Sequence, residues 1–222
     1  MHLPGLVTVR PDQTETIAQL ADIVGLAFLD EPWSRAWLSA LDEIGGTEER
    51  KLAISRAIIR YNFTFGAPYE TCYMLPDMTA GAGGYRASEL NGRIWNDIED
   101  ESTEALMKEF LTEEEAVALA KRAEDLAKVT NFKWMLERAG SNDFVHFYAL
   151  GVDPKARGTG AFRKLFTPFL DYADTHGMPC YLECYSDRLE GLYGSFGFET
   201  VERLGDSAFD IVERAMVRTP RG

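Results

Sequence analysis

The chain has 222 residues, with 23 Lys and Arg against 36 Asp and Glu, which gives a formal net charge of −13. Proteins that bind nucleic acid or anionic membranes through charge need clustered Lys and Arg, so this acidic balance argues against both classes of partner. With 45% hydrophobic and 12% aromatic residues, the chain is also too apolar to be disordered. Its length suits one domain.

The cysteine content and the N-terminus indicate where the protein works. Cys72, Cys180 and Cys184 are too few and too unevenly spaced for a secreted disulfide framework. The N-terminus lacks the basic start and apolar core of a signal peptide, and no window approaches the ~18 apolar residues of a membrane span. We therefore expect a soluble cytoplasmic protein, a monomer or homodimer, without nucleic acid or membrane partners.

The first third of the chain predicts helices after one short strand. A β-rich run precedes a helix that we expect to begin at a capping box formed by Asp12 and Glu15, and to end near Leu29. Thr47 is placed to cap a further helix that ends at Gly66.

The middle third predicts a hairpin followed by helices. Residues 69–75 and 80–87 have the composition of two strands joined by a turn. Residues 91–140 are too many for an ordinary connection, and they contain a second capping box, Thr112 with Glu115. They predict a helical insertion.

The last third alternates strands and helices. Strands are predicted at 144–153, 178–184, 198–204 and 209–218, with helices at 159–176 and 187–196. The order strand, helix, strand, helix, strand, strand implies an α/β (α+β) protein whose central mixed sheet contains a βαβ unit. With no linker or repeat, residues 1–222 are expected to form a single domain.

The connection after the 144–153 strand has the features of an anion site. The strand ends at Asp153-Pro154, a loop with two glycines follows, and an amphipathic helix begins at once. Free backbone N–H groups and the positive end of the helix dipole then lie beside Arg157. The loop is neither a Walker loop nor a Gly-x-Gly-x-x-Gly fingerprint, so an ordinary tight turn is the alternative.

At this loop the chain resembles the GNAT superfamily of acyl-CoA-dependent N-acyltransferases. Leu150, Val152, Pro154, Arg157 and Gly160 match the central motif of that superfamily in order, and Leu192-Tyr-Gly-Ser-Phe-Gly-Phe198 resembles the short helix that ends in Tyr-x-x-x-Gly-Phe. The resemblance is strong over about 144–220 and weaker over 7–38. In the weaker part, Phe28-Leu-Asp-Glu-Pro resembles the N-terminal segment of the family.

The resemblance implies a fold and a co-substrate. The fold would be a twisted, mostly antiparallel mixed sheet flanked by helices, with the insertion at 91–140 and an acyl-CoA-binding core at about 144–204. Acetyl-CoA would be the co-substrate, with its pyrophosphate on the loop and its pantetheine arm along the preceding strand end. The residues implied are Leu150, Gly151, Val152, Arg157, Gly158, Thr159, Gly160, Ala161 and Phe162.

The implied reaction is direct attack of a primary amine, expected to belong to a small cationic molecule, on the acetyl group. Tyr193 matches the family's general acid by position, and a tyrosine stays protonated at neutral pH. Glu183, at a strand end, is a candidate to accept or orient the amine's proton, and His146 a candidate to relay it. Each residue also has a non-catalytic alternative. Tyr193 could be an aromatic anchor of its helix, Glu183 a solvated carboxylate and His146 an ordinary sheet residue.

Departures from the family pattern leave a second function open. Phe162 stands where the loop usually has Gly or Ala, Leu189 replaces an asparagine, and Cys184-Tyr185 replaces a Ser-like position. The alternative is therefore a weakly active or inactive acyl-CoA-binding or sensing protein on the same fold, and a third possibility is a metabolite-binding α/β domain.

Two further patterns carry weaker hypotheses. His176, Cys180 and Cys184 have even spacing but fall on different elements, so we expect no metal site. The acidic run from Asp97 to Glu104 is a solvated helix face or, by hypothesis, the border of the entrance for a cationic acceptor.

Overall fold

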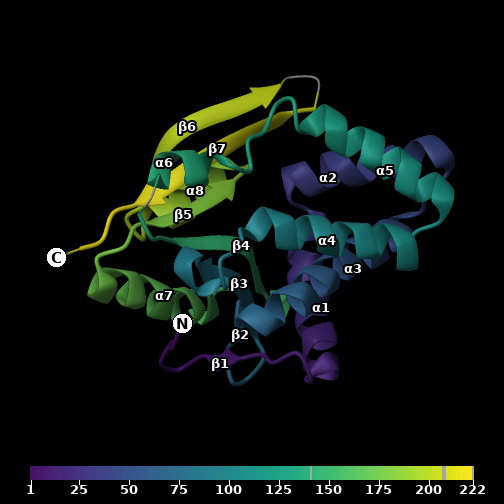
Figure 1. The fold of residues 1–222 in the computed structure, drawn as a ribbon. Helices are drawn as coiled ribbons and strands as arrows, with labels where there is room; N and C mark the ends of the chain where they lie inside the picture. The colour runs from purple at the N-terminus through teal and green to yellow at the C-terminus, as the bar shows by residue number, and fades with distance from the viewer. Residues whose placement is uncertain (141, 207–208, 222) are drawn as a thin grey trace.

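The computed structural model describes residues 1–140, 142–206 and 209–221. These residues form a seven-stranded sheet in the order β1-β2-β3-β4-β5-β7-β6, in which all neighbours are antiparallel except β4 and β5 (Figure 1). The predicted fold class is confirmed. The strands are β1 (Val7–Thr8), β2 (Cys72–Met74), β3 (Ala80–Arg86), β4 (Val145–Val152), β5 (Cys180–Cys184), β6 (Glu199–Asp206) and β7 (Ile211–Arg218).

Helices cover both faces of the sheet. One face packs against α7, and the other against α1, α3, α4 and α6, so the sheet separates two apolar layers (Figure 1). The segment 91–140 contributes α4, α5 and α6. The helices are α1 (Thr14–Leu29), α2 (Pro32–Leu38), α3 (Glu48–Gly66), α4 (Trp95–Glu109), α5 (Glu113–Leu126), α6 (Trp134–Ala139), α7 (Ala161–His176) and α8 (Asp187–Gly194).

The capping boxes predicted from the sequence differ in outcome. Thr112 and Glu115 form theirs, with the Thr112 N–H donating to Glu115 at 2.9 Å and the Glu115 N–H donating to Thr112 Oγ1 at 3.3 Å. The box at Asp12 was a wrong prediction. Gln13 is the N-cap residue of α1, and its side chain instead accepts a hydrogen bond from the N–H of Arg10, so the helix begins two residues after Asp12.

The glycine-rich run of β3 accommodates side chains from other elements. A Cβ atom at Gly81 would lie 2.1 Å from Leu20 of α1, and one at Gly83 would lie 2.3 Å from the ring of Tyr148. Small residues are needed at these positions because the space above the strand is already filled. The run is therefore a strand in spite of its low β-propensity.

A β-bulge in β4 changes which side chains share a face. Gly83 pairs with Ala149 and Gly84 with Phe147, which leaves Tyr148 without a cross-strand partner. His146 and Tyr148 lie on the face covered by α3 and α4, whereas Leu150 packs against the core under α7. A strict alternation would place His146, Tyr148 and Leu150 on one face, and the extra residue of the bulge moves Leu150 to the other face.

The two parallel strands diverge soon after they meet. Val145 pairs with Cys180 and His146 with Tyr181, and the register between β4 and β5 ends there. The rest of β4, toward Val152, has no partner strand on its β5 side among the described residues. This divergence leaves backbone N–H and C=O groups free at the centre of the sheet, where a ligand can pair with them.

Candidate active site

The loop between β4 and α7 has the backbone of an anion site. Gly158 and Gly160 have φ of +80° and +85°, a region that favours glycine. Gly160 is the N-cap residue of α7, and no side chain caps this helix end. The first N–H groups of α7 therefore point into the loop without an intrahelical acceptor, beside the exposed Arg157.

The end of β4 leads directly into this loop. A Cβ atom at Gly151 would lie 2.7 Å from the Cα of Val24, so this glycine lets α1 approach the strand closely. The side chains of Leu150 and Val152 pack toward the core under α7. Their backbone groups on the β5 side face the opening between the two strands.

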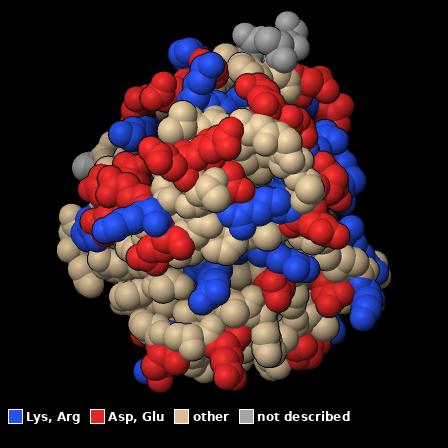
Figure 2. Space-filling model, turned by 90° about the vertical axis from the view of Figure 1, so that its right-hand side faces the viewer, with Lys and Arg blue, Asp and Glu red and all other residues tan. Residues whose placement is uncertain are grey.

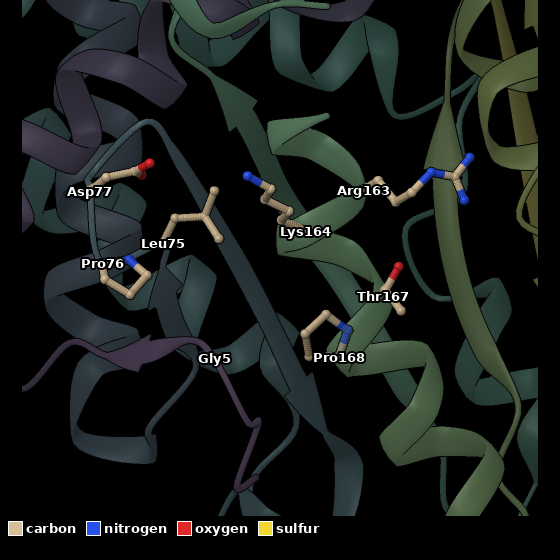
Figure 3. Close-up of a pocket in the computed structure, with 8 residues that line it drawn as sticks. All are labelled: Gly5, Leu75, Pro76, Asp77, Arg163, Lys164, Thr167 and Pro168. Atoms are coloured by element: carbon tan, nitrogen blue, oxygen red, sulfur yellow. The ribbon is translucent and has the colours of Figure 1, made fainter. Parts of the chain in front are cut away.

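A separate cavity of about 690 Å³ lies between α7 and the turn after β2. Figure 3 shows Lys164 directed toward the Leu75–Asp77 turn, whereas Arg163 is directed away from it. The guanidinium carbon of Arg163 lies 5.0 Å above the ring of Phe196 instead. None of the residues predicted to bind the cofactor or to take part in catalysis lines this cavity.

Tyr193 lies on α8, packed against the aromatic core. Only 6% of its surface is exposed, and its ring lies 6.1 Å from Phe162 and 5.8 Å from Phe166. Burial raises the pKa of Tyr193 above its ordinary range, and the charges of Cys184 and Glu31 add to this effect. The hydroxyl is therefore protonated at neutral pH, as a proton donor must be.

Glu31 is a functional candidate that the sequence interpretation missed. It is the N-cap residue of α2, and its Oε2 accepts hydrogen bonds from the N–H groups of Trp33 and Ser34 at 3.0 and 3.3 Å. Its Oε1 is buried and has no hydrogen-bond partner among the described residues. Burial raises the pKa of the Glu31 carboxyl to about 7, although the two N–H donors lower it. The signal was present in Phe28-Leu-Asp-Glu-Pro, interpreted there only as the family's opening.

His146 and Glu183 form a buried pair on the face opposite α7. His146 Nε2 lies 3.0 and 3.2 Å from the two carboxylate oxygens of Glu183, and the indole N–H of Trp134 donates to the same carboxylate. Since the carboxylate can only accept, Nε2 carries a proton and donates it in these hydrogen bonds. Nδ1 is buried and has no partner among the described residues.

In the acidic run on α4, Glu99 is partly buried, whereas the other acidic residues are exposed. Asp97, Asp100 and Glu104 are exposed, and Glu101 pairs with Arg93 at 2.6 Å. Glu99 is only partly exposed, and burial raises its pKa to about 7, while nearby His146 lowers it and Glu183 raises it again. Figure 2 shows acidic and basic side chains interspersed over the helical face on the right of Figure 1.

Comparisons with known proteins identify the fold. The sequence matches no protein-family profile and no curated protein. Arylalkylamine N-acetyltransferase 2 of Aedes aegypti superposes with a TM-score of 0.57 at 14% identity, over 97% of this chain and 98% of that one. The Corynebacterium glutamicum protein named histone acetyltransferase HPA2 and related acetyltransferase gives 0.56 at 15% identity, over 100% and 98%. A mutant agmatine N-acetyltransferase gives 0.51 at 16% identity, over 96% and 98%.

The chain has the GNAT fold. In this fold, the diverging strands are β4 and β5, and the loop that follows β4 is the one that carries the predicted anion site. The sequence resemblance is thereby confirmed at the level of the fold, over nearly the whole chain.

Two departures from the GNAT pattern pack against the core under α7. The ring of Phe162 stacks on Phe166 at 5.1 Å and meets Phe196 edge-on at 5.7 Å, so it turns into the core. Leu189 packs against the same core, and its N–H donates to Ser186 Oγ, the cap of α8.

The cysteines are buried in this GNAT fold. Cys72, Cys180 and Cys184 are free thiols, and burial raises the pKa of Cys184 to about 12, which disfavours a thiolate. His176 stacks on Tyr172 at the exposed end of α7. Among the described residues, no group of three or more His, Cys, Asp or Glu is arranged to hold a metal ion, and no helix could cross a membrane.

Proposed function

We propose that this protein is an N-acetyltransferase that transfers the acetyl group of acetyl-CoA to a primary amine of a small cationic molecule. The observation that carries the proposal is the uncapped N-terminus of α7 after a strand, β4, whose edge β5 leaves free, in a chain with the GNAT fold. The charge of Glu31 also raises the pKa of Tyr193 and of Cys184, at the end of β5. In this proposal Tyr193 is the proton donor and Glu31 the proton acceptor.

The names of the similar structures support an amine acceptor. They are an arylalkylamine N-acetyltransferase and an agmatine N-acetyltransferase, together with a histone acetyltransferase-related protein. The first two act on small amines. The net charge of −13 favours a small cationic acceptor over an anionic one, and a cytoplasmic location remains our prediction.

The residues present fit acetyl-CoA. The free N–H groups at the start of α7, the positive φ of Gly158 and Gly160, and the exposed Arg157 suit its pyrophosphate. The free edge of β4 at Leu150–Val152 suits the amide groups of its pantetheine arm. When bound, acetyl-CoA supplies an electrophilic thioester carbonyl and a thiol leaving group.

Proton transfer by the chain's own residues would make the amine reactive. Glu31 takes a proton from the incoming ammonium, because its pKa of about 7 lies near the working pH. Tyr193 gives its hydroxyl proton to the departing sulfur and recovers one from the attacking nitrogen. Buried carboxylates and hydroxyls transfer protons efficiently because no bulk water competes.

Glu183 and His146, for which the sequence predicts roles in accepting or relaying the proton, pair with each other on the face opposite α7, whereas Tyr193 packs in the core under α7. The hydrogen bond from Nε2 to Glu183 fixes the orientation of the ring, and its buried Nδ1 has no partner among the described residues. In the proposed function this pair binds the acceptor, and its role in proton transfer stays a prediction.

The function is tested by mixing the protein with acetyl-CoA and a panel of amines and by measuring thiol release. We expect release with small primary amines. Binding of acetyl-CoA in calorimetry without any turnover would support the sensing alternative, and the absence of binding heat at millimolar acetyl-CoA would reject both functions.

A further inference from the structure

The bulge in β4 changes the direction of the backbone as well as that of the side chains. Before it, the N–H of Val145 donates to the carbonyl of Pro179 at 3.0 Å, toward β5. After it, the N–H of Asp153 donates to the carbonyl of Thr79 at 2.9 Å, toward β3. These two residues are an even number of positions apart, so in a regular strand their N–H groups would point to the same side. The bulge therefore reverses the backbone groups that follow it.

This reversal decides which N–H groups face the free edge of β4. Because the N–H of Asp153 points toward β3, that of Gly151 does so as well, and those of Leu150 and Val152 point into the opening between β4 and β5. In a strand without the bulge, the N–H of Gly151 would face the opening instead. The hydrogen-bonding pattern offered to a ligand at this edge thus depends on the bulge.

Two neighbours hold the bulged residue, Tyr148, in place. Trp95, at the start of α4, stacks on its ring with centroids 3.8 Å apart and planes 20° apart (Figure 1). A Cβ atom at Gly83 of β3 would lie 2.3 Å from the same ring, so the ring rests directly on the glycine backbone. Only 3% of Trp95 is exposed. The ring of Tyr148 is therefore enclosed between α4 and β3.

Further contacts tie this stack to the sheet. The other neighbour of the Trp95 ring is Tyr85 of β3, at 5.5 Å and 22°. The hydroxyl of Tyr148 lies 2.9 Å from Oγ1 of Thr71, which is fully buried. Trp95 thus joins the segment 91–140 to the bulge and to the strand that pairs with it.

We propose that Trp95 is a positioning residue, which holds the β4 bulge through Tyr148 and so keeps the N–H groups of Leu150 and Val152 directed at the pantetheine arm of acetyl-CoA. The inference rests on the proposed function, and it gives the segment 91–140 a role in that function. Without the stack, the bulge can relax toward a regular strand and turn these N–H groups away. The pyrophosphate loop follows the end of β4 and should keep its own anion site.

The test compares two ligands by calorimetry. These are acetyl-CoA and ADP, which has a pyrophosphate but no pantetheine arm. In Trp95→Leu, the Kd of acetyl-CoA should rise about tenfold, whereas that of ADP should stay within about twofold of wild type. Trp95→Phe should keep the affinity for acetyl-CoA within about threefold of wild type, because an aromatic ring can still stack on Tyr148.

Leu106→Ala is the matched control. Leu106 lies in the same helix and is fully buried, but it packs in a different apolar cluster from Tyr148. Its loss should lower the melting temperature by leaving a cavity, and both ligands should bind as to wild type. If Trp95→Leu does not fold, Gly83→Ala displaces the Tyr148 ring from the other side and should give the same difference between the ligands.

The outcomes separate this inference from the proposed function. Equal losses for acetyl-CoA and ADP in the folded variant would indicate a general structural role and overturn the inference, as would wild-type affinity for acetyl-CoA. The expected difference without acetylation of any amine by wild type would reject the proposed function and retain the positioning role. Acetylation of amines with an unchanged kcat/KM and an unchanged Kd of acetyl-CoA in Trp95→Leu would do the reverse.

Discussion

The imidazole of His146 turns Nε2 toward Glu183, at 3.0 Å from the nearer carboxylate oxygen, and leaves Nδ1 buried without a partner among the described residues. β4 and β5 pair at His146 and diverge beyond it, so this bond closes the base of the opening between the strands. In His146→Gln, kcat should stay within about threefold of wild type and KM for the amine should rise about tenfold, since the residue binds the acceptor. If kcat instead fell by about 100-fold or more, His146 would be shown to relay the proton.

Tyr193→Phe removes the proposed proton donor and keeps the ring. We expect kcat for acetyl transfer to fall about 100-fold, the lower range for loss of a general acid. The melting temperature should change little, because the packing against Phe162 and Phe166 is retained. An unchanged kcat would show that the thiolate leaves without protonation by Tyr193. Initial rates at saturating amine provide the measurement.

Glu31→Gln tests the proton acceptor through its pH dependence. The pKa of about 7 means that the wild-type carboxyl is protonated, and inactive as a base, below that pH. The ratio of wild-type to variant kcat/KM should therefore be about 100 at pH 8 and fall about tenfold per unit below pH 7. Because both proteins are measured with the same amine, the ionisation of the substrate affects both rates equally and cancels in the ratio.

The neighbouring exposed Asp30 provides the matched control for Glu31. Asp30→Asn should leave the profile unchanged, since its side chain lies outside the buried cap. A ratio that does not vary with pH would remove Glu31 from the proton-transfer scheme. In Glu31→Gln the side-chain amide oxygen can still accept the N–H bonds at the start of α2, so the melting temperature should stay close to that of wild type.

Glu99 should make the protein less stable as the pH rises. Its pKa is raised from 4.5 to about 7 in the folded state, so its stabilising contribution is complete below about pH 4.5 and is lost as the pH passes 7. Between pH 5 and 8, the free energy of unfolding of Glu99→Gln should gain about 1 to 3 kcal/mol relative to wild type. Urea denaturation at each pH measures this. For the control Glu104→Gln, the free energy of unfolding should change with pH as it does for wild type. If it also did so for Glu99→Gln, burial would not raise the pKa of Glu99.

Gly160→Ala tests the anion loop. An L-residue at φ of +85° costs about 1 kcal/mol or more, so the loop should shift and the Kd of acetyl-CoA should rise about tenfold in calorimetry. Gly191→Ala is the control, because Gly191 lies within α8 with open space around its Cα and without a positive φ. It should keep wild-type affinity and stabilise the helix slightly. Equal affinity in both variants would remove the loop from the binding site.

The local elements could largely be predicted because neighbouring residues decide them. The capping box of Thr112 and Glu115, and the two glycines before α7, each act over a few residues of chain. The run of small residues in β3 obscured its strand, because its composition suits the side chain of Leu20 from another element. At Asp12 the local pattern gave the wrong helix start, because Gln13 is the N-cap residue and the helix begins at Thr14.

By itself, the sequence determined the order of strands and helices, the anion loop at Gly158 and Gly160, and the resemblance to the GNAT fold, because periodicity and turn chemistry are local. Only the tertiary structure decided that Tyr148 is the bulged residue of β4, that the charge of Glu31 acts on Tyr193, and that the charges of His146 and Glu183 act on Glu99. These relationships join residues distant in sequence. They depend on how β4 and β5 diverge and on how α4 packs across them, which no pattern within one segment specifies.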